Sequence, residues 1–164
     1  MENQYSFGAK RISILWLIVL AMAVVVFASS KHRFVSPGIE REKLVRDFVE
    51  AFNARNIDLM LQLVDENVQW LNVNGVKVSI ETEGKDALRQ SMGRYFSSCP
   101  SCKSSLEWVQ SAGSRVTAME RASWSGKSGA KSQRSLSVYE FSGDKILRVY
   151  YFPAEADTPA PGSK

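Results

Sequence analysis

The chain has 164 residues, of which 45% are hydrophobic and 23% are charged, and its formal net charge at pH 7 is +4. This composition fits one compact domain with additional terminal segments. The basic residues are scattered singly among acidic ones and form no basic patch. The charge pattern therefore argues against a nucleic-acid partner.

An apolar segment, ISILWLIVLAMAVVVFA, occupies residues 12–28 and contains no charge, Gly or Pro. The hydrocarbon core of a bilayer needs roughly 17–25 helical residues to span it, and this segment reaches that length. We therefore predict a transmembrane helix over residues 12–29, which makes the membrane the first expected partner. The alternative is a secretory signal cleaved near Ser30, because Ala28 and Ser29 are small.

Basic residues lie on both sides of this segment, with Lys10 and Arg11 before it and Lys31 and Arg33 after it. Their opposing effects on orientation nearly cancel. We predict a cytoplasmic N-terminus (residues 1–11), because N-terminal segments of this kind are normally inserted that way, and two cysteines suit an oxidising compartment. The chain would then be a single-pass membrane protein with a linker (residues 30–39) and a periplasmic or otherwise extracytoplasmic domain. If the signal is cleaved, the domain is secreted.

The segment after the linker has the period of an amphipathic helix. Its apolar residues recur at three- and four-residue spacing, which predicts a helix from Glu40 to a polar turn near Asn53. Asp58 is expected to cap a second, short helix. The pattern changes to alternation at Val68, which predicts the first strand. The apolar positions of the first helix are Leu44, Val45, Phe48, Val49 and Phe52.

The remainder contains one more helical segment and several strand-like ones. Helices followed by a series of strands indicate the α+β class. Residues 154–164 contain too few apolar side chains to pack, and we predict a disordered tail there. The expected helix covers residues 85–96, and the expected strands cover 76–81, 106–110, 115–124, 132–141 and 146–152.

The stretch LVRDFVEAFNARNIDLMLQLVDENVQW, residues 44–70, resembles the opening of the nuclear transport factor 2-like (NTF2-like) superfamily, in particular its SnoaL-like members. YEFSGDKI, residues 139–146, with Arg148 and Tyr150, is similar to that family's final hairpin. The resemblance covers residues 40–153. It implies a cone-shaped, cystatin-like α+β fold with three helices against a curved, mostly antiparallel sheet, and a homodimer formed through the sheet.

Cys99 and Cys102 form a CxxC motif. We expect a structural disulfide, and the alternatives are a redox site or two reduced thiols. Redox chemistry is disfavoured because the pair follows a predicted helix, whose C-terminal dipole opposes a thiolate. Zinc would need four ligands, whereas the chain adds only His32 to the cysteines. No metal site and no cofactor are expected.

Alternation in the predicted strand 115–124 places an acidic residue, Glu120, among apolar neighbours on one face. If this face lines the interior, burial would raise the pKa of Glu120 and make it a candidate catalytic acid or base. Alternatively the face meets solvent or a partner, or Glu120 pairs with Arg148 or Arg94. The other residues of this face are Val116, Ala118, Ala122 and Trp124.

Aromatic residues are frequent in the predicted helices and strands, and most of them are expected to form the core. Some could line a pocket for a small apolar ligand. The predicted pocket residues are Trp70, Tyr95, Glu120, Trp124, Tyr139 and Tyr150.

The enzymes of this family provide a check on catalysis. Ketosteroid isomerase-like members use a tyrosine and an aspartate where this chain has Phe48 and Trp70. Limonene-epoxide-hydrolase-like members use an Asp-Arg-Asp set, whereas no strand aspartate accompanies Arg121 or Arg148. SnoaL-type cyclases rely on His and Asp, and His32 is the chain's single histidine. These differences lower the expectation of an enzyme.

Three functions therefore remain open. The favoured one is noncatalytic binding of a small apolar ligand or a protein partner by a membrane-tethered domain outside the cytoplasm. The second is a dimeric assembly module of an envelope complex. The third is a hydrolase or isomerase that acts on a small apolar substrate with Glu120 as acid or base.

Overall fold

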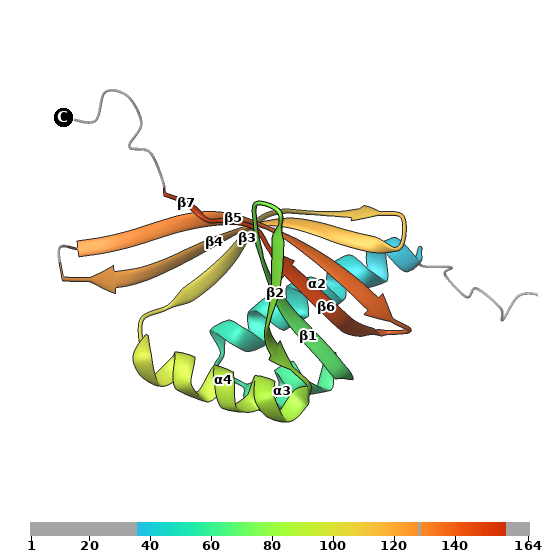
Figure 1. Ribbon diagram of the computed structural model, residues 1–164, viewed down its shortest axis with the longest axis horizontal. Helices are drawn as coiled ribbons and strands as arrows, with labels where there is room; N and C mark the ends of the chain where they lie inside the picture. Colours follow the sequence, from blue (N-terminus) through green and yellow to red (C-terminus); the bar gives the residue numbers. More distant parts are fainter. Residues whose placement is uncertain (1–35, 128, 157–164) are drawn as a thin grey trace, which may run out of the picture. The chain divides into compact units, whose positions relative to one another are not determined.

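The computed structural model describes residues 36–127 and 129–156, which form three helices and seven strands (Figure 1). The helices are α2 (Pro37–Asn53), α3 (Ile57–Gln62) and α4 (Lys85–Ser98). The strands are β1 (Val64–Asn74), β2 (Lys77–Glu83), β3 (Lys103–Ala112), β4 (Arg115–Gly126), β5 (Gly129–Ser142), β6 (Lys145–Tyr151) and β7 (Glu155–Ala156).

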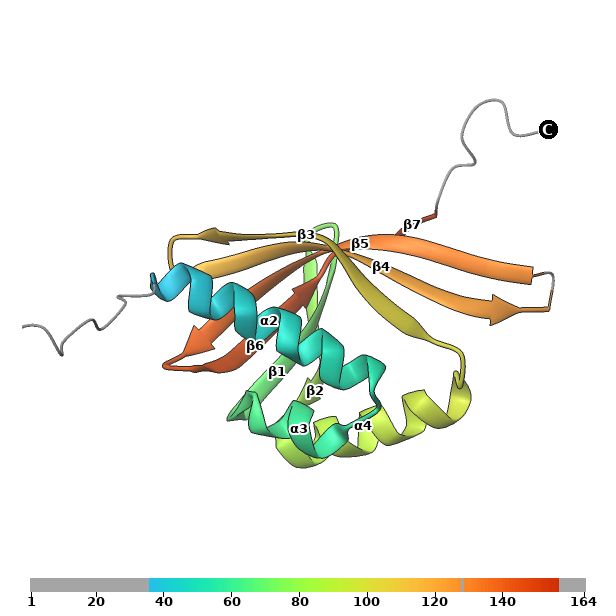
Figure 2. The same ribbon diagram turned by 180° about the vertical axis from the view of Figure 1, so that it is seen from behind.

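The strands form one mixed sheet in the order β2-β1-β6-β5-β4-β3, and β7 pairs with β5. The pairs are antiparallel except for β1 and β6, which run parallel although more than 60 residues separate their pairing partners Val64 and Ile146 along the chain. Helix α2 lies along one side of the curved sheet, with α3 and α4 below it (Figures 1 and 2). The predicted α+β class with three helices against a curved sheet is confirmed.

Helix α4 begins at Lys85 as expected, whereas α2 and α3 begin at other residues than predicted. Helix α2 starts at Pro37 rather than Glu40. Proline is favoured there because the first N–H groups of a helix have no partner within the helix, and because its fixed φ suits the first turn. The cap of α3 is Asn56, whose side chain accepts a hydrogen bond from the N–H of Leu59 at 3.0 Å. Asp58 instead lies in the first turn, where its carboxylate accepts from Arg89 at 2.7 Å.

The strands also extend further than the pattern indicated. Strand β1 begins at Val64 rather than Val68, because Val64 pairs with Ile146 of β6. Strand β7 lies within the predicted disordered tail. Its two residues pair with Gln133 and Arg134 of β5, beyond the end of β6. The pairing uses backbone groups, which explains why an apolar-poor segment can join the sheet.

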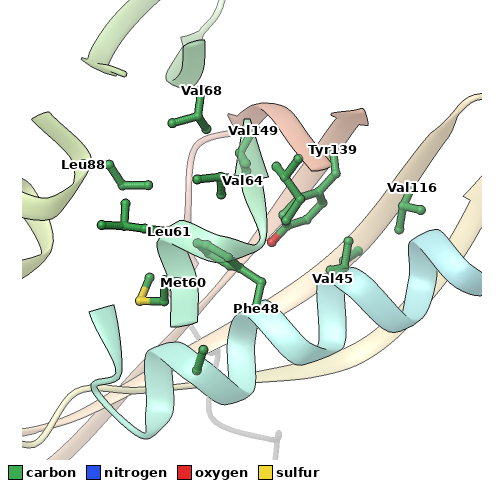
Figure 3. Close-up of a cluster of buried hydrophobic side chains, with 13 residues drawn as sticks. Val45, Phe48, Met60, Leu61, Val64, Val68, Leu88, Val116, Tyr139 and Val149 are labelled. Carbon is green, nitrogen blue, oxygen red and sulfur yellow. The ribbon is translucent and has the colours of Figure 1, made fainter. Parts of the chain in front are cut away.

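The core lies between the helices and the sheet. Val45 and Phe48 of α2 face Val64 and Tyr139 of the sheet (Figure 3). The core residues with the lowest exposure are Val45, Met60, Val64, Val116, Ala118, Tyr139, Ile146 and Val149. The apolar stripe of the first helix thus packs as its period predicts, although Leu44 and Phe52 lie at the edge of the core.

The predicted transmembrane segment, residues 12–29, lies outside the described residues, as do the predicted cytoplasmic residues 1–11. Within the described part of the chain, no helix combines the length and the apolarity needed to cross a membrane.

Candidate functional site

A cavity of about 410 Å³ opens between α2, α4 and the concave side of the sheet. Its wall is mainly aromatic and apolar, with Glu120 of β4 among the few polar groups. The apolar part of the lining consists of Phe48, Phe52, Trp70, Met92, Tyr95 and Tyr151, and the polar part includes Glu81, Lys103, Ser104 and Gln133. This composition is typical of pockets for small organic molecules.

Glu120 is 6% exposed and accepts hydrogen bonds from four hydroxyl groups. Its Oε1 accepts from Ser137 at 2.7 Å and from Tyr139 at 2.5 Å. Its Oε2 accepts from Tyr151 at 2.8 Å and, at the longer distance of 3.4 Å, from Ser104. Ser104 and Tyr151 line the cavity, whereas Ser137 and Tyr139 do not. Oε2 is therefore the oxygen on the cavity side.

The two tyrosines bonded to Glu120 are held in their neutral form. Burial, followed by the negative charge of Glu120, raises the pKa of Tyr139 well above its ordinary value. The same two causes, in the same order, raise the pKa of Tyr151. Both phenols therefore act as hydrogen-bond donors to the carboxylate throughout the physiological range.

A second recess of about 260 Å³ meets the cavity at Glu120. It is bounded by residues that follow β6, such as Phe152 and Ala154, and by Asn72 and Ser135. The two spaces share Ser104, Glu120, Ala122, Gln133 and Tyr151. Glu120 thus lies at the junction of the two spaces.

Three of the predicted pocket residues line the cavity: Trp70, Tyr95 and Glu120. Trp70 stacks on Tyr151, with ring centroids 5.5 Å apart. Tyr139 is fully buried behind Glu120 and reaches the site only through that carboxylate. The alternation that placed Glu120 on an inward face is therefore matched by the structure, where Val116 and Ala118 are also buried.

The other two predicted residues, Trp124 and Tyr150, lie elsewhere. Trp124 pairs with Lys131 near the tip of the β4–β5 hairpin, beyond the helices that cover the sheet (Figure 1). The hydroxyl of Tyr150 donates to Glu140 at 3.2 Å. Successive side chains of a strand point to opposite faces, so the side chains of Tyr150 and its neighbour Tyr151 lie on opposite sides of the sheet.

Tyr151, Ser104 and Ser137 bind Glu120, although sequence reasoning did not select them. Tyr151 could have been found by alternation, because it shares a face with the buried Val149. The serines carry no comparable signal, since Ser104 and Ser137 belong to serine-rich segments that resemble solvated strands.

The predicted ion pairs of Glu120 are not formed. Arg148 donates to Glu140 at 3.4 Å and to Gln69 at 2.9 Å, and Arg94 is exposed on α4. Across residues 36–127 and 129–156, Glu120 takes part in no ion pair, and no cluster of three His, Cys, Asp or Glu side chains is arranged to hold a metal ion.

Cys99 and Cys102 form a disulfide just after α4, as predicted. The loop that contains it is joined to the α2–α3 turn, because Arg55 donates to the carbonyl oxygens of Phe96, Cys99 and Pro100. Asn53 adds a two-way pair with the backbone of Ser104, at 2.6 and 2.8 Å. These contacts fix the position of Ser104, whose hydroxyl donates to Glu120, against the end of α2.

Structural comparison shows the same fold in several proteins. An uncharacterised cystatin-fold protein from Novosphingobium aromaticivorans is 22% identical, with a TM-score of 0.61 over 68% of this chain and 97% of that one. An NTF2-like protein of unknown function from Burkholderia pseudomallei is 15% identical, with a TM-score of 0.58 over 72% of this chain and 91% of that one. At these identities the likeness concerns the fold alone.

An enzyme also appears among these structures. An epoxide hydrolase from M. tuberculosis, of the LEH-like type, is 13% identical, with a TM-score of 0.58 over 71% of this chain and 84% of that one. No curated protein matched the sequence. The family model described as a SnoaL-like domain matches residues 45–149, which run from the core of α2 to the core of β6. The chain therefore belongs to the SnoaL-like family and has the NTF2-like fold.

Proposed function

We propose that this domain binds a small, largely apolar molecule in the cavity, with one hydrogen-bond donor of the ligand directed at Oε2 of Glu120. The observation that carries this proposal is a buried carboxylate in the wall of a mainly apolar cavity of about 410 Å³. The apolar wall supplies affinity, and the carboxylate supplies orientation. An open cavity of this kind favours a ligand over a purely structural assembly role.

The hydrogen bonds of Glu120 favour binding over catalysis. An ionised carboxylate accepts at about four sites, and four hydroxyls already occupy them. A catalytic base needs a free site that faces the substrate. The long 3.4 Å bond from Ser104 is the weakest of the four, so a ligand donor would take its place on Oε2.

Calorimetry with two matched probes tests the proposal. 1-Naphthalenemethanol carries a hydroxyl donor, and its methyl ether has almost the same shape but no donor. We expect the alcohol to bind the purified full-length chain about tenfold more tightly, because a hydrogen bond to a charged group contributes roughly 1.5–3 kcal/mol. Glu120→Gln should reduce this difference. Equal affinities for the two probes, or no binding of either, would contradict the proposal.

Acid–base catalysis on a small apolar substrate is the second candidate, because Glu120 lies in the cavity wall beside two phenols that retain their protons. Since an epoxide hydrolase shares the fold, styrene oxide is a suitable probe. Diol formation that is lost in Glu120→Gln and kept in Glu50→Gln, an exposed position on α2, would favour this candidate over simple binding.

A further inference from the structure

The charge of Glu120 is not neutralised within the described residues. Its four partners there are hydroxyl groups. Hydroxyls satisfy the hydrogen-bonding capacity of a carboxylate but carry no compensating positive charge. A buried charge without an ion partner is costly, and proteins usually place a cation beside it. The cavity thus presents a negative centre without a protein counter-ion.

The neighbouring side chains do not change this balance. Burial and the charge of Glu120 keep Tyr139 and Tyr151 protonated, so neither adds charge. Glu81 and Lys103 are the other ionisable lining residues besides Tyr95 and Tyr151. Two carboxylates against one ammonium group leave the cavity with a net negative charge.

Lys103 is also engaged away from Glu120. Its Nζ donates to the backbone oxygen of Asn53 at 2.6 Å, at the turn that ends α2. The partner of Glu81 is also a neutral group, because its Oε1 accepts from the side-chain amide of Asn72 at 2.9 Å. Within the described residues no cation therefore pairs with Oε2, where a cation supplied from outside would take the place of the long 3.4 Å bond from Ser104.

The wall around this position also suits a cation. The faces of aromatic rings attract positive charge, most strongly those of tryptophan. Trp70 and Tyr151 border the cavity as a stacked pair, and Phe48 lies 5.6 Å from Trp70 between ring centroids. An ammonium group beside Oε2 would meet both the carboxylate and these rings, while its apolar substituent filled the space towards Tyr95 and Met92.

We propose that the ligand of this cavity is an organic amine, bound as its ammonium ion between Glu120 and the aromatic wall. This inference rests on the proposed binding function and specifies the chemical class of the ligand. It also excludes carboxylates and phosphates as ligands, because their charge would lie against Glu120 in a low-dielectric site.

Three naphthalene probes of similar shape test the inference: 1-naphthylmethylamine, 1-naphthalenemethanol and 1-naphthoate. Calorimetry on the purified full-length chain at pH 7 should show the amine binding at least about tenfold more tightly than the alcohol. Naphthoate should show no measurable binding. This comparison uses the unaltered chain and so does not depend on any variant folding.

Two variants then locate the effect. Glu120→Gln should remove the preference for the amine, whereas Glu50→Gln, which removes the same charge from the exposed side of α2, should retain it. Ala122→Phe, which fills the space beside Glu120, should abolish binding of the amine and the alcohol alike. If Glu120→Gln fails to fold, Ala122→Phe still shows whether the probes occupy this cavity.

Each outcome has one meaning. If the alcohol binds as tightly as the amine, the amine inference is wrong while the proposed binding function stands. If naphthoate, which has no hydrogen-bond donor at pH 7, binds best, both the amine inference and the proposed hydrogen bond to Glu120 are wrong. The inference is also wrong if the preference for the amine survives Glu120→Gln or if Ala122→Phe leaves binding unchanged. Failure of all three probes to bind would overturn the proposed function itself.

Discussion

At the scale of single residues, Glu120 is the side chain around which the site is arranged. It joins β4, β5, β6 and β3 through one carboxylate, because its four hydroxyl partners come from the other three strands. In a buried network of this kind, losing one donor leaves the remaining groups imperfectly satisfied. The energetic contribution of each hydroxyl therefore depends on how deeply its bond to Glu120 is buried.

Tyr139→Phe removes a fully buried donor at 2.5 Å from Glu120. We expect it to lower the free energy of unfolding by about 1–3 kcal/mol, as measured by urea denaturation, because the hydroxyl bonds a buried charged group. Tyr150→Phe is the matched control, since its 3.2 Å bond to Glu140 lies on the other face and is only partly buried. We expect less than about 1 kcal/mol there, and equal losses in the two variants would contradict the network described.

The raised pKa values of Tyr139 and Tyr151 predict a loss of stability at high pH. Above the ordinary tyrosine pKa of 10.0 the unfolded chain releases phenolic protons that the folded chain retains. The unfolded state then binds fewer protons, and so the free energy of unfolding falls as the pH rises. Below that pH the contribution is fully present. Absorbance at 295 nm should show both phenols ionising only well above pH 10 or on unfolding, and ordinary titration of all tyrosines would count against their burial beside Glu120.

At the scale of elements, the α2–α3 turn and the disulfide loop after α4 are joined by Arg55. Its guanidinium group donates to carbonyl oxygens of the loop and lies 5.1 Å from the centroid of the Phe96 ring. Arg55 itself has a φ of 57°, a left-handed conformation that non-glycine residues rarely adopt. The strained backbone of Arg55 therefore persists because its side chain is held by the carbonyl oxygens of the disulfide loop.

Substitutions at Arg55 separate these two effects. Arg55→Ala should lower the free energy of unfolding by about 1–3 kcal/mol, because the carbonyl oxygens lose a charged donor. Arg55→Gly loses the same donor, but glycine adopts the left-handed conformation without strain. Its free energy of unfolding should therefore be roughly 1 kcal/mol higher than that of the alanine variant. Urea denaturation of both variants measures the difference. Equal stability, or a more stable alanine variant, would show that the backbone conformation is not strained.

At the scale of the whole molecule, the location of the domain depends on the predicted transmembrane helix, residues 12–29, which lies outside the described residues. We propose that it anchors the chain, with residues 1–11 in the cytoplasm and the domain outside. The disulfide between Cys99 and Cys102 would be stable in such a compartment. A binding domain held at a membrane would meet ligands that partition there, which agrees with a mainly apolar cavity wall.

Fractionation of cells that express the full-length chain tests this location. We expect the protein in the membrane pellet, resistant to alkaline carbonate extraction, with an intact mass that still includes Met1. A chain that lacks residues 1–29 should appear in the soluble fraction. A mature protein that begins near Lys31 would instead favour the cleaved signal and a secreted domain.

Much of the local structure follows directly from the sequence. The three- and four-residue spacing in α2 and the alternation in β4 each involve neighbours within one turn or one strand, so short-range chemistry reveals which side is buried. Glu120 was found in this way. Tyr151 was not, although its alternation with the buried Val149 also indicated an inward side chain.

Other features of the site depend on contacts between distant parts of the chain. Trp124 has the inward alternation of Glu120, yet the hairpin that carries it extends past the helices. Asn56 rather than Asp58 caps α3, although both residue types cap equally well in isolation. The parallel pairing of β1 with β6 is made by backbone groups, which nearly every residue has, so the pattern of side chains does not predict it.

The sequence by itself determined the three helices, most of the strands, the α+β class, the family and the inward orientation of Glu120, because these depend on periodicity and on motifs within short stretches. The tertiary structure alone decided which hydroxyls surround that carboxylate, where the cavity opens and which charges are absent from its wall. These are relations between residues such as Ser104, Glu120 and Tyr151, which lie far apart in the chain. They are set by strand order and register, since backbone hydrogen bonds join strands without regard to side-chain identity.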